Sequence, residues 1–518
     1  MVEQPEIQSG SILSRWLLLA CLVFAGLVAG GYLLASQAVH GIGFPLDDAW
    51  IHQTYARNLV DFHQWSFVPG EPSAGSTSPL WSLLLAVGYL FKSGPFLWTF
   101  ILGTIFLGLT GLIGEKWAQN TRNGPGLKLP VVAIFLIGEW HLAWSAVSGM
   151  ETILFALIIL AVFYGLSLGK KEWLVGILIG ISIWVRPDGI TLLGPAVFLY
   201  SLDSGSWKNR FARIIKLLIP VVLLAAAYGT FNYSISQTWL PNTFFAKQAE
   251  YAANQQLPLI ERIFSLGTLP LIGPGLLLLP GFVYFAGLSI RKWNWAKLGM
   301  LLWWLGYILI YVVRLPVTYQ HGRYLIPSMP VFFVAGLVGT FDLIQKLQNN
   351  ACEAKPRAGI TLRLRRLSAF GWTAGIAVLW AVMIVVGAFT YAQDVAIIDT
   401  EMVATAKWIS ANAPPDAIIG AHDIGALGYF GGHKILDLAG LVSPAVIPFI
   451  RDEAALERYL IQNRASVLIT FPGWYPQLVI GLPILFRTNG TFSPASGGEN
   501  MVVFGFAQVW YYFQNPIQ

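Results

Sequence analysis

Two adjacent carboxylates, Asp47 and Asp48, stand in a polar loop that follows the first long apolar segment of the chain. Neighbouring acids suit either the deprotonation of a hydroxyl or the coordination of a divalent cation such as Mg²⁺ or Mn²⁺. Repulsion between the two charges raises one pKa, which suits a general base. The simpler alternative is that Asp48 only caps a helix, although capping needs one carboxylate rather than two. A metal-free base and a metal site at Asp47 and Asp48 both stay open.

Further polar residues stand at the ends of later apolar segments. An ionisable residue at a helix end inside a bundle is a candidate for function, whereas contact with lipid headgroups is the simpler interpretation. Cations, and Arg above all, are suited to holding a phosphate. The candidates for substrate or phosphate binding here are Arg57, Glu151, Arg186, Asp188, Asn242, Lys247, His321, Arg323 and Tyr324, with Arg314 as a further cation.

The pair His422 and Asp423 follows a strand-like run near the C-terminus. Such a pair can act as a base or bind a ligand, but at a strand end it more often satisfies its own loop, and we favour that interpretation. The sequence has no Gly-rich phosphate loop with a Lys, no nucleophile elbow and no zinc-ligand spacing. Nucleotide-sugar and ATP chemistry therefore have no visible site.

Membrane helices must position these residues. Of the 518 residues, 56% are hydrophobic and 11% are charged, whereas about a quarter are charged in an ordinary soluble domain. A run of about 20 apolar residues crosses a bilayer as a helix, and the chain offers about eleven such runs. They lie near 15–36, 80–113, 129–147, 152–168, 173–186, 188–203, 217–236, 270–290, 298–314, 324–345 and 368–391. We treat 80–113 as one crossing, although it could form one helix or two.

The net charge of +6 reflects loops on one side of the membrane rather than a nucleic-acid surface. Basic residues gather in alternate loops, which is the positive-inside pattern. These loops contain Lys116, Arg122 and Lys128, then Lys170 and Lys171, 208–216, 291–297 and 346–366. We therefore expect a multi-pass plasma-membrane protein whose N-terminus is cytoplasmic and whose polar motifs and C-terminal unit lie outside.

The chain divides into a membrane domain at 1–392, which includes a first outer loop at 37–79, and an outer unit at 393–518. Alternating strand-like and helix-like runs predict a small α/β fold for the outer unit. No internal repeat supports an inverted-repeat transporter. In the first outer loop, Ile51, Tyr55, Leu59 and Phe62 predict a helix lying on the membrane interface, with His52, Gln53, Arg57 and Asp61 facing away.

The ordered motifs resemble the GT-C superfamily of integral-membrane glycosyltransferases. The motifs are DDAWIHQTYARNL, VPGEPSAGSTSPLW, SGMETILFAL, WVRPDG, LPNTFFAK, HGRYLIP and HDIGALGYFGGHKILDLAGLV. Their order is similar to the branch that contains the mycobacterial terminal β-1,2-arabinofuranosyltransferase and its bacterial relatives, over nearly the whole chain. The chain departs from relatives that commonly have Tyr at Trp50 and Glu-Gly at Ala74-Gly75.

This resemblance implies a polytopic α-helical membrane protein of GT-C type with a small C-terminal extracytoplasmic α/β domain. It implies an enzyme that moves a sugar from a polyprenyl-phosphate donor to a cell-envelope glycan, lipid or protein acceptor on the outer face. Asp47 and Asp48 would be the catalytic pair of an inverting transfer, and the branch points to a pentofuranose such as arabinofuranose. The departures leave the sugar and the acceptor open.

Two other functions fit a chain with many helices and embedded charges. A lipid-linked sugar transporter or flippase predicts a charged route near the middle of the membrane, whereas the charges here gather at one end of the predicted helices. A non-catalytic envelope-assembly protein predicts that Asn at positions 47 and 48 leaves activity intact.

Overall fold

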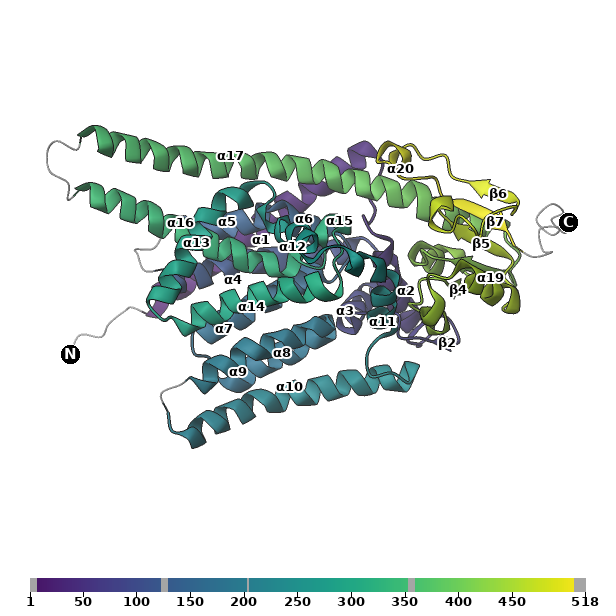
Figure 1. Cartoon of the computed structure of the whole chain (residues 1–518), viewed down its shortest axis with the longest axis horizontal. Helices are drawn as coiled ribbons and strands as arrows, with labels where there is room; N and C mark the ends of the chain where they lie inside the picture. Colours follow the sequence, from purple (N-terminus) through teal and green to yellow (C-terminus); the bar gives the residue numbers. More distant parts are fainter. Residues whose placement is uncertain (1–6, 123–128, 203–204, 353–358, 507–518) are drawn as a thin grey trace.

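The computed structural model describes residues 7–122, 129–202, 205–352 and 359–506, with side chains described from 15 to 346 and from 364 to 506 outside the same gaps. Lys128, part of the basic stretch 346–366 and the end of the outer unit, 507–518, therefore lie outside the described residues. Within the described part, a bundle of long helices carries a small sheet at one end (Figure 1). The chain is a multi-pass α-helical membrane protein with a small C-terminal sheet unit, as the sequence predicts.

Seven helices of the described residues are long and apolar enough to cross a membrane, judged by length and composition. They are α1 (Ile7–Val39), α4 (Leu97–Thr121), α10 (Trp207–Ser236), α13 (Pro274–Arg291), α14 (Trp295–Arg314), α16 (Met329–Cys352) and α17 (Gly359–Ile398). Shorter apolar helices are α3 (Pro79–Leu90), α7 (Thr152–Ser167) and α8 (Glu172–Val185). Exposed side chains such as Leu223 and Val385 suit contact with lipid, which is as apolar as they are.

The run 80–113 forms two helices of which one, α4, is long enough to span a membrane. Residues 91–96 separate it from α3, which packs against α2 (Asp47–Asp61). This arrangement matches the treatment of the run as a single crossing, with α3 as a short additional piece.

A charged residue breaks the run 129–147, and another ends the run 173–186. Glu139 has extended backbone angles, and its side chain accepts a hydrogen bond from Leu142 N at 3.1 Å, so α5 (Val131–Gly138) ends there and α6 (Trp140–Val147) begins. Arg186 is also extended because a residue before proline avoids the helical region. The chain then continues as η1 (Pro187–Leu192) and α9 (Leu193–Ser201).

The first outer loop contains the expected helix, α2, but the prediction of its orientation is wrong for two residues. Ile51 and Tyr55 are buried, yet His52 and Gln53 are buried as well and Phe62 is half exposed. Gln53 donates to Thr99 Oγ1 at 2.9 Å, and His52 Nδ1 lies 3.0 Å from Ser82 Oγ. Because these partners satisfy its polar side chains, α2 packs into the bundle end rather than lying on a membrane surface.

The C-terminal sheet has five strands in the order β4-β3-β5-β7-β6. β3 (Ile418–Ala421) pairs in parallel with β4 (Lys434–Asp437) and β5 (Val467–Thr470), while β7 (Val502–Gly505) is antiparallel to β5 and to β6 (Ile484–Arg487). The accompanying helices are α18 (Ala404–Asn412), α19 (Glu453–Gln462) and α20 (Phe492–Ala495). This is the small α/β fold that the alternating pattern predicts.

The remaining elements are short. They are β1 (Ser66–Val68), β2 (Glu71–Pro72), α11 (Asn242–Glu250), η2 (Ala252–Gln256), α12 (Leu259–Gly267), η3 (Leu269–Leu271), α15 (Tyr319–Gly322), η4 (Ile326–Ser328), η6 (Asp399–Val403), η7 (Leu427–Gly431), η8 (Pro444–Phe449) and η9 (Pro472–Trp474). Figure 1 shows α2, α3 and α11 at the end of the bundle next to the sheet, and the start of α1 at the opposite end.

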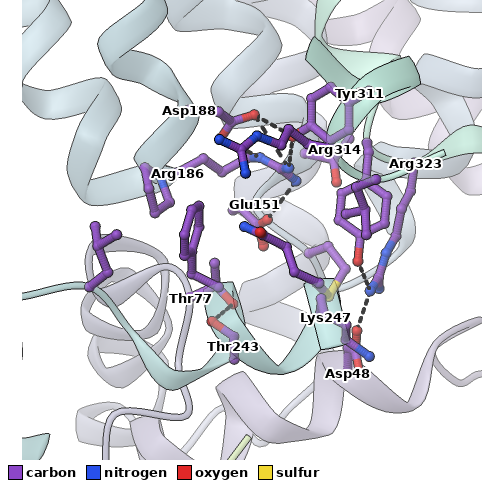
Figure 2. A pocket seen from close by; sticks show the side chains of 18 of the residues that line it. Asp48, Thr77, Glu151, Arg186, Asp188, Thr243, Lys247, Tyr311, Arg314 and Arg323 are labelled. Atoms are coloured by element: carbon purple, nitrogen blue, oxygen red, sulfur yellow. Dashed lines mark hydrogen bonds and ion pairs between the residues drawn. The ribbon is translucent and has the colours of Figure 1, made fainter. Parts of the chain in front are cut away.

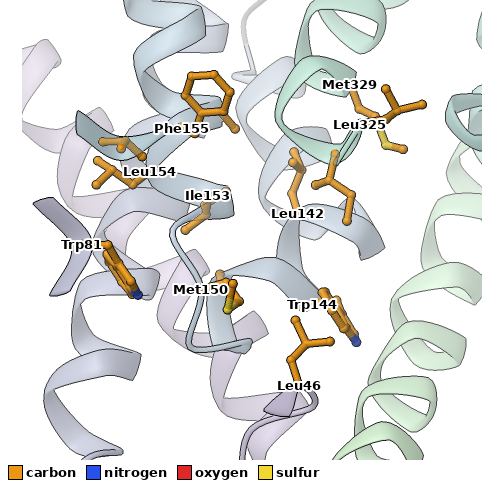
Figure 3. Packing of buried hydrophobic residues seen from close by; sticks show 14 of the residues in the cluster. Leu46, Trp81, Leu142, Trp144, Met150, Ile153, Leu154, Phe155, Leu325 and Met329 are labelled. Carbon is orange, nitrogen blue, oxygen red and sulfur yellow. The ribbon is translucent and has the colours of Figure 1, made fainter. Parts of the chain in front are cut away.

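Buried hydrophobic residues fix the loop that precedes α7 (Figure 3). Trp81 is almost fully buried, and its indole N–H donates to Gly149 O at 2.8 Å. Gly149 has a positive φ of 80°, and a Cβ there would meet Phe44 and Ala49 at less than 3 Å. The tight Ser148-Gly149-Met150 turn therefore requires glycine and presents Glu151 beside α2.

Candidate active site

A cavity of about 440 Å³ lies where α2, α11, α14 and the start of η1 meet. Figure 2 shows charged side chains from these elements facing one another across it. Eight of the sequence candidates line it, namely Asp48, Glu151, Arg186, Asp188, Lys247, Arg314, Arg323 and Tyr324. The sequence separates these residues widely, and the fold brings them to the end of the bundle next to the sheet.

Asp48 and Arg323 form the ion pair at the base of this cavity. Arg323 Nη2 donates to Asp48 Oδ2 at 2.5 Å and also to Tyr324 Oη at 3.1 Å, while the buried Nη1 has no hydrogen-bond partner. Burial alone would raise the pKa of Asp48, but the charges of Arg323 and Lys247 hold it well below its ordinary value. Asp48 is therefore ionised, and Arg323 has a donor left for a second anion.

Asp48 does not act as the helix cap. Leu46 occupies the N-cap position of α2 without a side-chain cap, and Asp48 lies in the first turn. A carboxylate there also favours the positive end of the helix dipole.

Asp47 faces a different way from its neighbour. Its two carboxylate oxygens accept hydrogen bonds from Gly425 N at 2.6 Å and from Ala426 N at 2.8 Å, in the loop after β3. Asp47 does not line the cavity. Burial raises its pKa and the charge of Asp423 raises it further, whereas the two N–H donors act in the opposite direction. The adjacent acids thus have different partners, one in the cavity and one in the outer unit.

Arg186 lies at the centre of a second charged network on the cavity wall. Its guanidinium is 3.4 Å from Glu151 Oε1 and 3.2 Å from Asp188 Oδ1, and it donates to Tyr311 Oη at 2.9 Å. Tyr307 and Tyr311 both donate to Asp188 Oδ2, at 2.6 and 2.7 Å. Because Arg186 already has these partners, the network is better suited to shaping the wall than to binding a new anion.

Glu151 joins this network to α2. Its Oε2 lies 3.5 Å from His52 Nε2, which is beyond a hydrogen bond. Burial would raise the pKa of Glu151, but His52 and the charge of Arg186 lower it.

Lys247 on α11 supplies a cation opposite Asp48. Its ammonium group lies 3.0 Å from Glu250 Oε2, and the charges of Glu250 and Asp48 raise its pKa despite burial. Thr243 on the same helix lies 3.0 Å from Thr77 of the first outer loop, which ties the two segments together. Arg314 also lines the cavity and is exposed, so it adds a fourth cation to Arg186, Lys247 and Arg323.

The outer unit completes the cavity through Leu441. Asp437 at the end of β4 accepts hydrogen bonds from Ala439 N at 2.8 Å and Val442 N at 2.7 Å, which shapes the loop that carries Leu441. A Cβ on Gly75 would lie 2.5 Å from Val442, so glycine allows the first outer loop to approach this closely.

Several sequence candidates lie outside the cavity lining. Arg57 donates to the carbonyl oxygens of Tyr429 and Gly428, at 2.6 and 3.2 Å, and so binds the outer unit. His321 pairs with Asp394 of α17 at 2.8 Å. Asn242 is buried at the start of α11.

His422 and Asp423 lie in the loop that also reaches Asp47. His422 has partners on both ring nitrogens: Tyr475 Oη at 2.7 Å and Glu250 Oε1 at 3.4 Å. Asp423 differs, because its buried Oδ2 accepts no hydrogen bond. The favoured interpretation of a satisfied loop therefore describes His422 better than Asp423.

Sequence reasoning missed two tyrosines and a glutamate that bind the charged residues. Tyr307 and Tyr311 stand four residues apart in the apolar helix α14, a spacing that places both hydroxyls on one face. That spacing was the available signal. Glu250 gave none, because its role depends on the distant His422.

The donor set at Asp47 and Asp48 does not fit a divalent cation. The described residues contain no group of three or more His, Cys, Asp or Glu side chains that could hold a metal ion. Both oxygens of Asp47 accept backbone N–H groups, and Asp48 is paired with Arg323. Mg²⁺ or Mn²⁺ would have to compete with these donors.

Solved structures share this fold over almost the whole chain. ArnT from Cupriavidus metallidurans bound to undecaprenyl phosphate has a TM-score of 0.55 and 15% identity, covering 94% of this chain and 98% of that chain. The oligosaccharyltransferase of Archaeoglobus fulgidus in the apo form has a TM-score of 0.58 and 11% identity, covering 88% of this chain and 69% of that chain. The archaeal oligosaccharyltransferase AglB from Archaeoglobus fulgidus, in complex with an inhibitory peptide and a dolichol-phosphate, has a TM-score of 0.55 and 12% identity. The match covers 88% of this chain and 69% of that chain. At such identities the likeness establishes the fold, which is the expected GT-C fold.

A family model described as a domain of unknown function (DUF8728) matches residues 390–504. No curated protein matches the chain. The similarity to the arabinofuranosyltransferase branch stays a prediction.

Proposed function

We propose that this protein is a membrane glycosyltransferase that moves a sugar from a polyprenyl-phosphate carrier to an acceptor hydroxyl at Asp48. The observation that carries the proposal is the meeting of Asp48 with Arg323 and Lys247 in one cavity, since it places an ionised carboxylate beside cations with capacity for a phosphate. The fold supports it too, because similar structures hold undecaprenyl phosphate or a dolichol-phosphate.

The cavity offers a place for the apolar tail of the carrier. Ile190, Phe244 and Ile310 line it, and each is more than 40% exposed. An isoprenoid chain would cover these side chains while its phosphate lies near the cations, and burial of apolar surface contributes about 25 cal/mol per Å².

The phosphate would lie against Arg323 Nη1, with Lys247 and Arg314 nearby. Arg323 already holds Asp48 through Nη2, so one guanidinium can contact the leaving phosphate and the base together. Negative charge grows on the phosphate oxygen as the glycosidic bond breaks, and fixed cations stabilise that charge. This arrangement also supplies the proximity between donor and base.

In the proposed transfer, the acceptor oxygen attacks the anomeric carbon from the face opposite the phosphate, so the anomeric centre inverts. The new carbon–oxygen bond forms as the bond to the phosphate oxygen breaks, and the bonding pair leaves with the polyprenyl phosphate. The hydroxyl proton passes to the Asp48 carboxylate. General-base catalysis contributes typically about 10²–10⁴-fold to the rate.

Asp47 has a different role in this proposal. Its oxygens are taken by the outer unit, so it positions Asp48 and the loop after β3 without touching substrate. No step requires a divalent cation, because the carboxylates do not present a free donor set for one.

The membrane arrangement completes the proposal. Residues 1–392 would form the catalytic membrane domain and 393–518 the outer unit, with the N-terminus in the cytoplasm of a plasma-membrane protein. The positive-inside pattern supports this orientation, as does the position of α1's start at the end opposite the sheet (Figure 1). The acceptor would be a glycan, lipid or protein of the cell envelope, and the resemblance favours a pentofuranose such as arabinofuranose.

The test is transfer by purified protein in lipid nanodiscs. A panel of polyprenyl-phosphate sugars, including arabinofuranose, would be combined with glycan acceptors, and the product linkage would be read by NMR. We expect one donor to be used by the wild type and not by Asp48→Asn. Transfer that survives Asp48→Asn contradicts the site. Absence of transfer together with movement of the donor across liposomes would favour a flippase.

A further inference from the structure

We propose that Trp474, His422, Asp423 and Glu250 form a carbohydrate subsite that binds the acceptor beside the cavity. That the bound saccharide is the acceptor rests on the proposed function, whereas the binding of a saccharide is a separate property. It assigns a role to an exposed aromatic residue of the outer unit and to the His422-Asp423 motif.

Trp474 is a large aromatic side chain, 49% exposed and held in place. It lies in the short η9 turn, where its backbone N–H donates to Phe471 O at 3.0 Å and its ring lies 5.1 Å from that of Phe471. Glu499 fixes the turn by accepting from Gly473 N at 2.7 Å. A rigid exposed ring loses little conformational entropy when it binds a partner. Its apolar face suits the C–H face of a sugar ring.

Polar groups for sugar hydroxyls lie next to this ring. The His422 ring meets Trp474 edge to face, with centroids 4.8 Å apart. The adjacent Asp423 has a buried carboxylate oxygen without a hydrogen-bond partner. Leaving such an oxygen unpaired costs free energy, and a hydroxyl donor would satisfy it. An aromatic platform beside a few convergent polar groups is the usual composition of a site for a small polar ligand.

A chain of side-chain contacts links the subsite to the cavity. His422 contacts Glu250 at 3.4 Å, and Glu250 contacts Lys247 at 3.0 Å. Lys247 lines the cavity, and the charges of Asp48 and Asp423 act on each other. A saccharide that stacks on Trp474 would therefore extend toward Asp48, which is the direction an acceptor hydroxyl must take.

The alternative occupants of this surface are less well matched. A lipid would find the polar His422 and the carboxylate of Glu250 beside the Trp474 ring, and these polar groups do not suit an apolar partner. A phosphate would meet the carboxylates of Asp423 and Glu250, which repel it. A neutral polyhydroxylated ligand is the chemistry that donates a hydrogen bond to Asp423 and stacks on Trp474, beside the His422 ring.

The experiment measures saccharide binding by the full-length protein in nanodiscs with saturation-transfer NMR. The probes are free trisaccharides of arabinofuranose, mannose and glucose. We expect one of them to bind the wild type, and Trp474→Ala to weaken that binding about tenfold, equivalent to about 1.4 kcal/mol. Trp474→Phe should restore most of the affinity. Ile480→Ala, at a still more exposed position in the same unit, should bind like the wild type.

A second measurement separates this inference from the proposed function. Asp48→Asn should bind the trisaccharide normally and fail to transfer sugar, while Trp474→Ala should raise the acceptor KM about tenfold and leave the donor KM unchanged. The subsite is overturned if no trisaccharide binds the wild type. It is also overturned if a folded Trp474→Ala variant binds the trisaccharide as tightly as the wild type does. If binding depends on Trp474 but no donor is ever used, the subsite stands and the transferase assignment falls.

Discussion

Asp47 accepts a hydrogen bond from the backbone N–H of Gly425 at 2.6 Å, across 378 residues of chain. A Cβ on Gly425 would lie 1.9 Å from Asp47 O, which no structure tolerates without movement. The contact therefore joins the first outer loop to the outer unit at a point where only glycine fits. Because Asp48 is the next residue, this contact also sets the position of the candidate base.

Gly425→Ala should loosen the outer unit from the membrane domain. The clash is with backbone rather than a flexible side chain, so we expect a loss of about 1–3 kcal/mol or more. Thermal unfolding in detergent and limited proteolysis measure it. Gly431→Ala is the matched control, since nothing lies within 4 Å of a Cβ there. Equal stability of the two variants would contradict the importance of the contact.

Asp48→Asn and Asp47→Asn should fail for different reasons. Asp48→Asn removes the proton acceptor, so we expect kcat to fall about 10²–10⁴-fold with the fold retained. Asp47→Asn keeps one acceptor oxygen but turns an amide toward one of two backbone N–H groups, so it should lower the unfolding temperature and retain part of the activity. Rates measured beside unfolding curves distinguish the two. A stable Asp47→Asn that is as inactive as Asp48→Asn would show that both acids take part in chemistry.

The sequence predicted the fold well because apolar runs and basic loops are local signals. Each expected run contains a helix or a broken helix, and the outer unit forms the expected small α/β fold, although β6 and β7 were not predicted. The candidates Asp48, Glu151, Arg186 and Arg323 meet in one cavity. The sequence shows which polar residue stands in each loop, but it does not show how far apart these residues lie in the folded protein.

The rest depended on contacts between distant segments. Asp47 and Asp48 look equivalent in sequence, and only their partners, Gly425 and Arg323, separate them. His52 and Gln53 were expected to face away because polarity was taken to mean exposure. They are buried because Ser82 and Thr99, on two later helices, supply their hydrogen bonds. Such pairing overrides the amphipathic pattern and leaves no local signal.

Arg323→Lys should weaken donor binding without removing the charge. Lysine cannot hold Asp48 and a phosphate through two fixed donors, and a lost hydrogen bond to a charged group costs about 1.5–3 kcal/mol. We expect the donor KM to rise about 10- to 100-fold, with a smaller change in the acceptor KM. Arg57→Lys serves as the control, because Arg57 contacts carbonyl oxygens of the outer unit rather than the cavity. A donor KM that is unchanged in Arg323→Lys would place the phosphate elsewhere.

Transfer should continue when divalent cations are removed. Arg323 and Lys247, rather than a metal ion, neutralise the charge of Asp48. EDTA at millimolar concentration should therefore change the initial rate less than twofold, which corresponds to about 0.4 kcal/mol in activation free energy. Rates would be compared after EDTA treatment and after Mg²⁺ or Mn²⁺ is added back. Loss of activity that either cation restores would show that the donor phosphate brings a metal ion to the carboxylates.

His422 should make the docking of the outer unit depend on pH. Burial lowers the pKa of His422, but the ion pair with Glu250 and the charge of Asp423 raise it overall, against an opposing effect of Lys247. Tyr475 is its other partner. A raised folded-state pKa means that the stabilisation is fully present below the ordinary His value of about 6.5 and is lost as the pH rises through the folded value.

The measurement is the difference in unfolding temperature between the wild type and His422→Gln across this range. We expect the difference to be largest near pH 5.5 and to shrink steadily toward pH 9, with the exposed His63→Gln showing no such trend. Glu250→Gln should flatten the wild-type dependence in the same way, because it removes the charge that favours protonated His422. A difference that grows with rising pH would mean that the neutral imidazole is the stabilising form, and that Tyr475 rather than Glu250 determines its state.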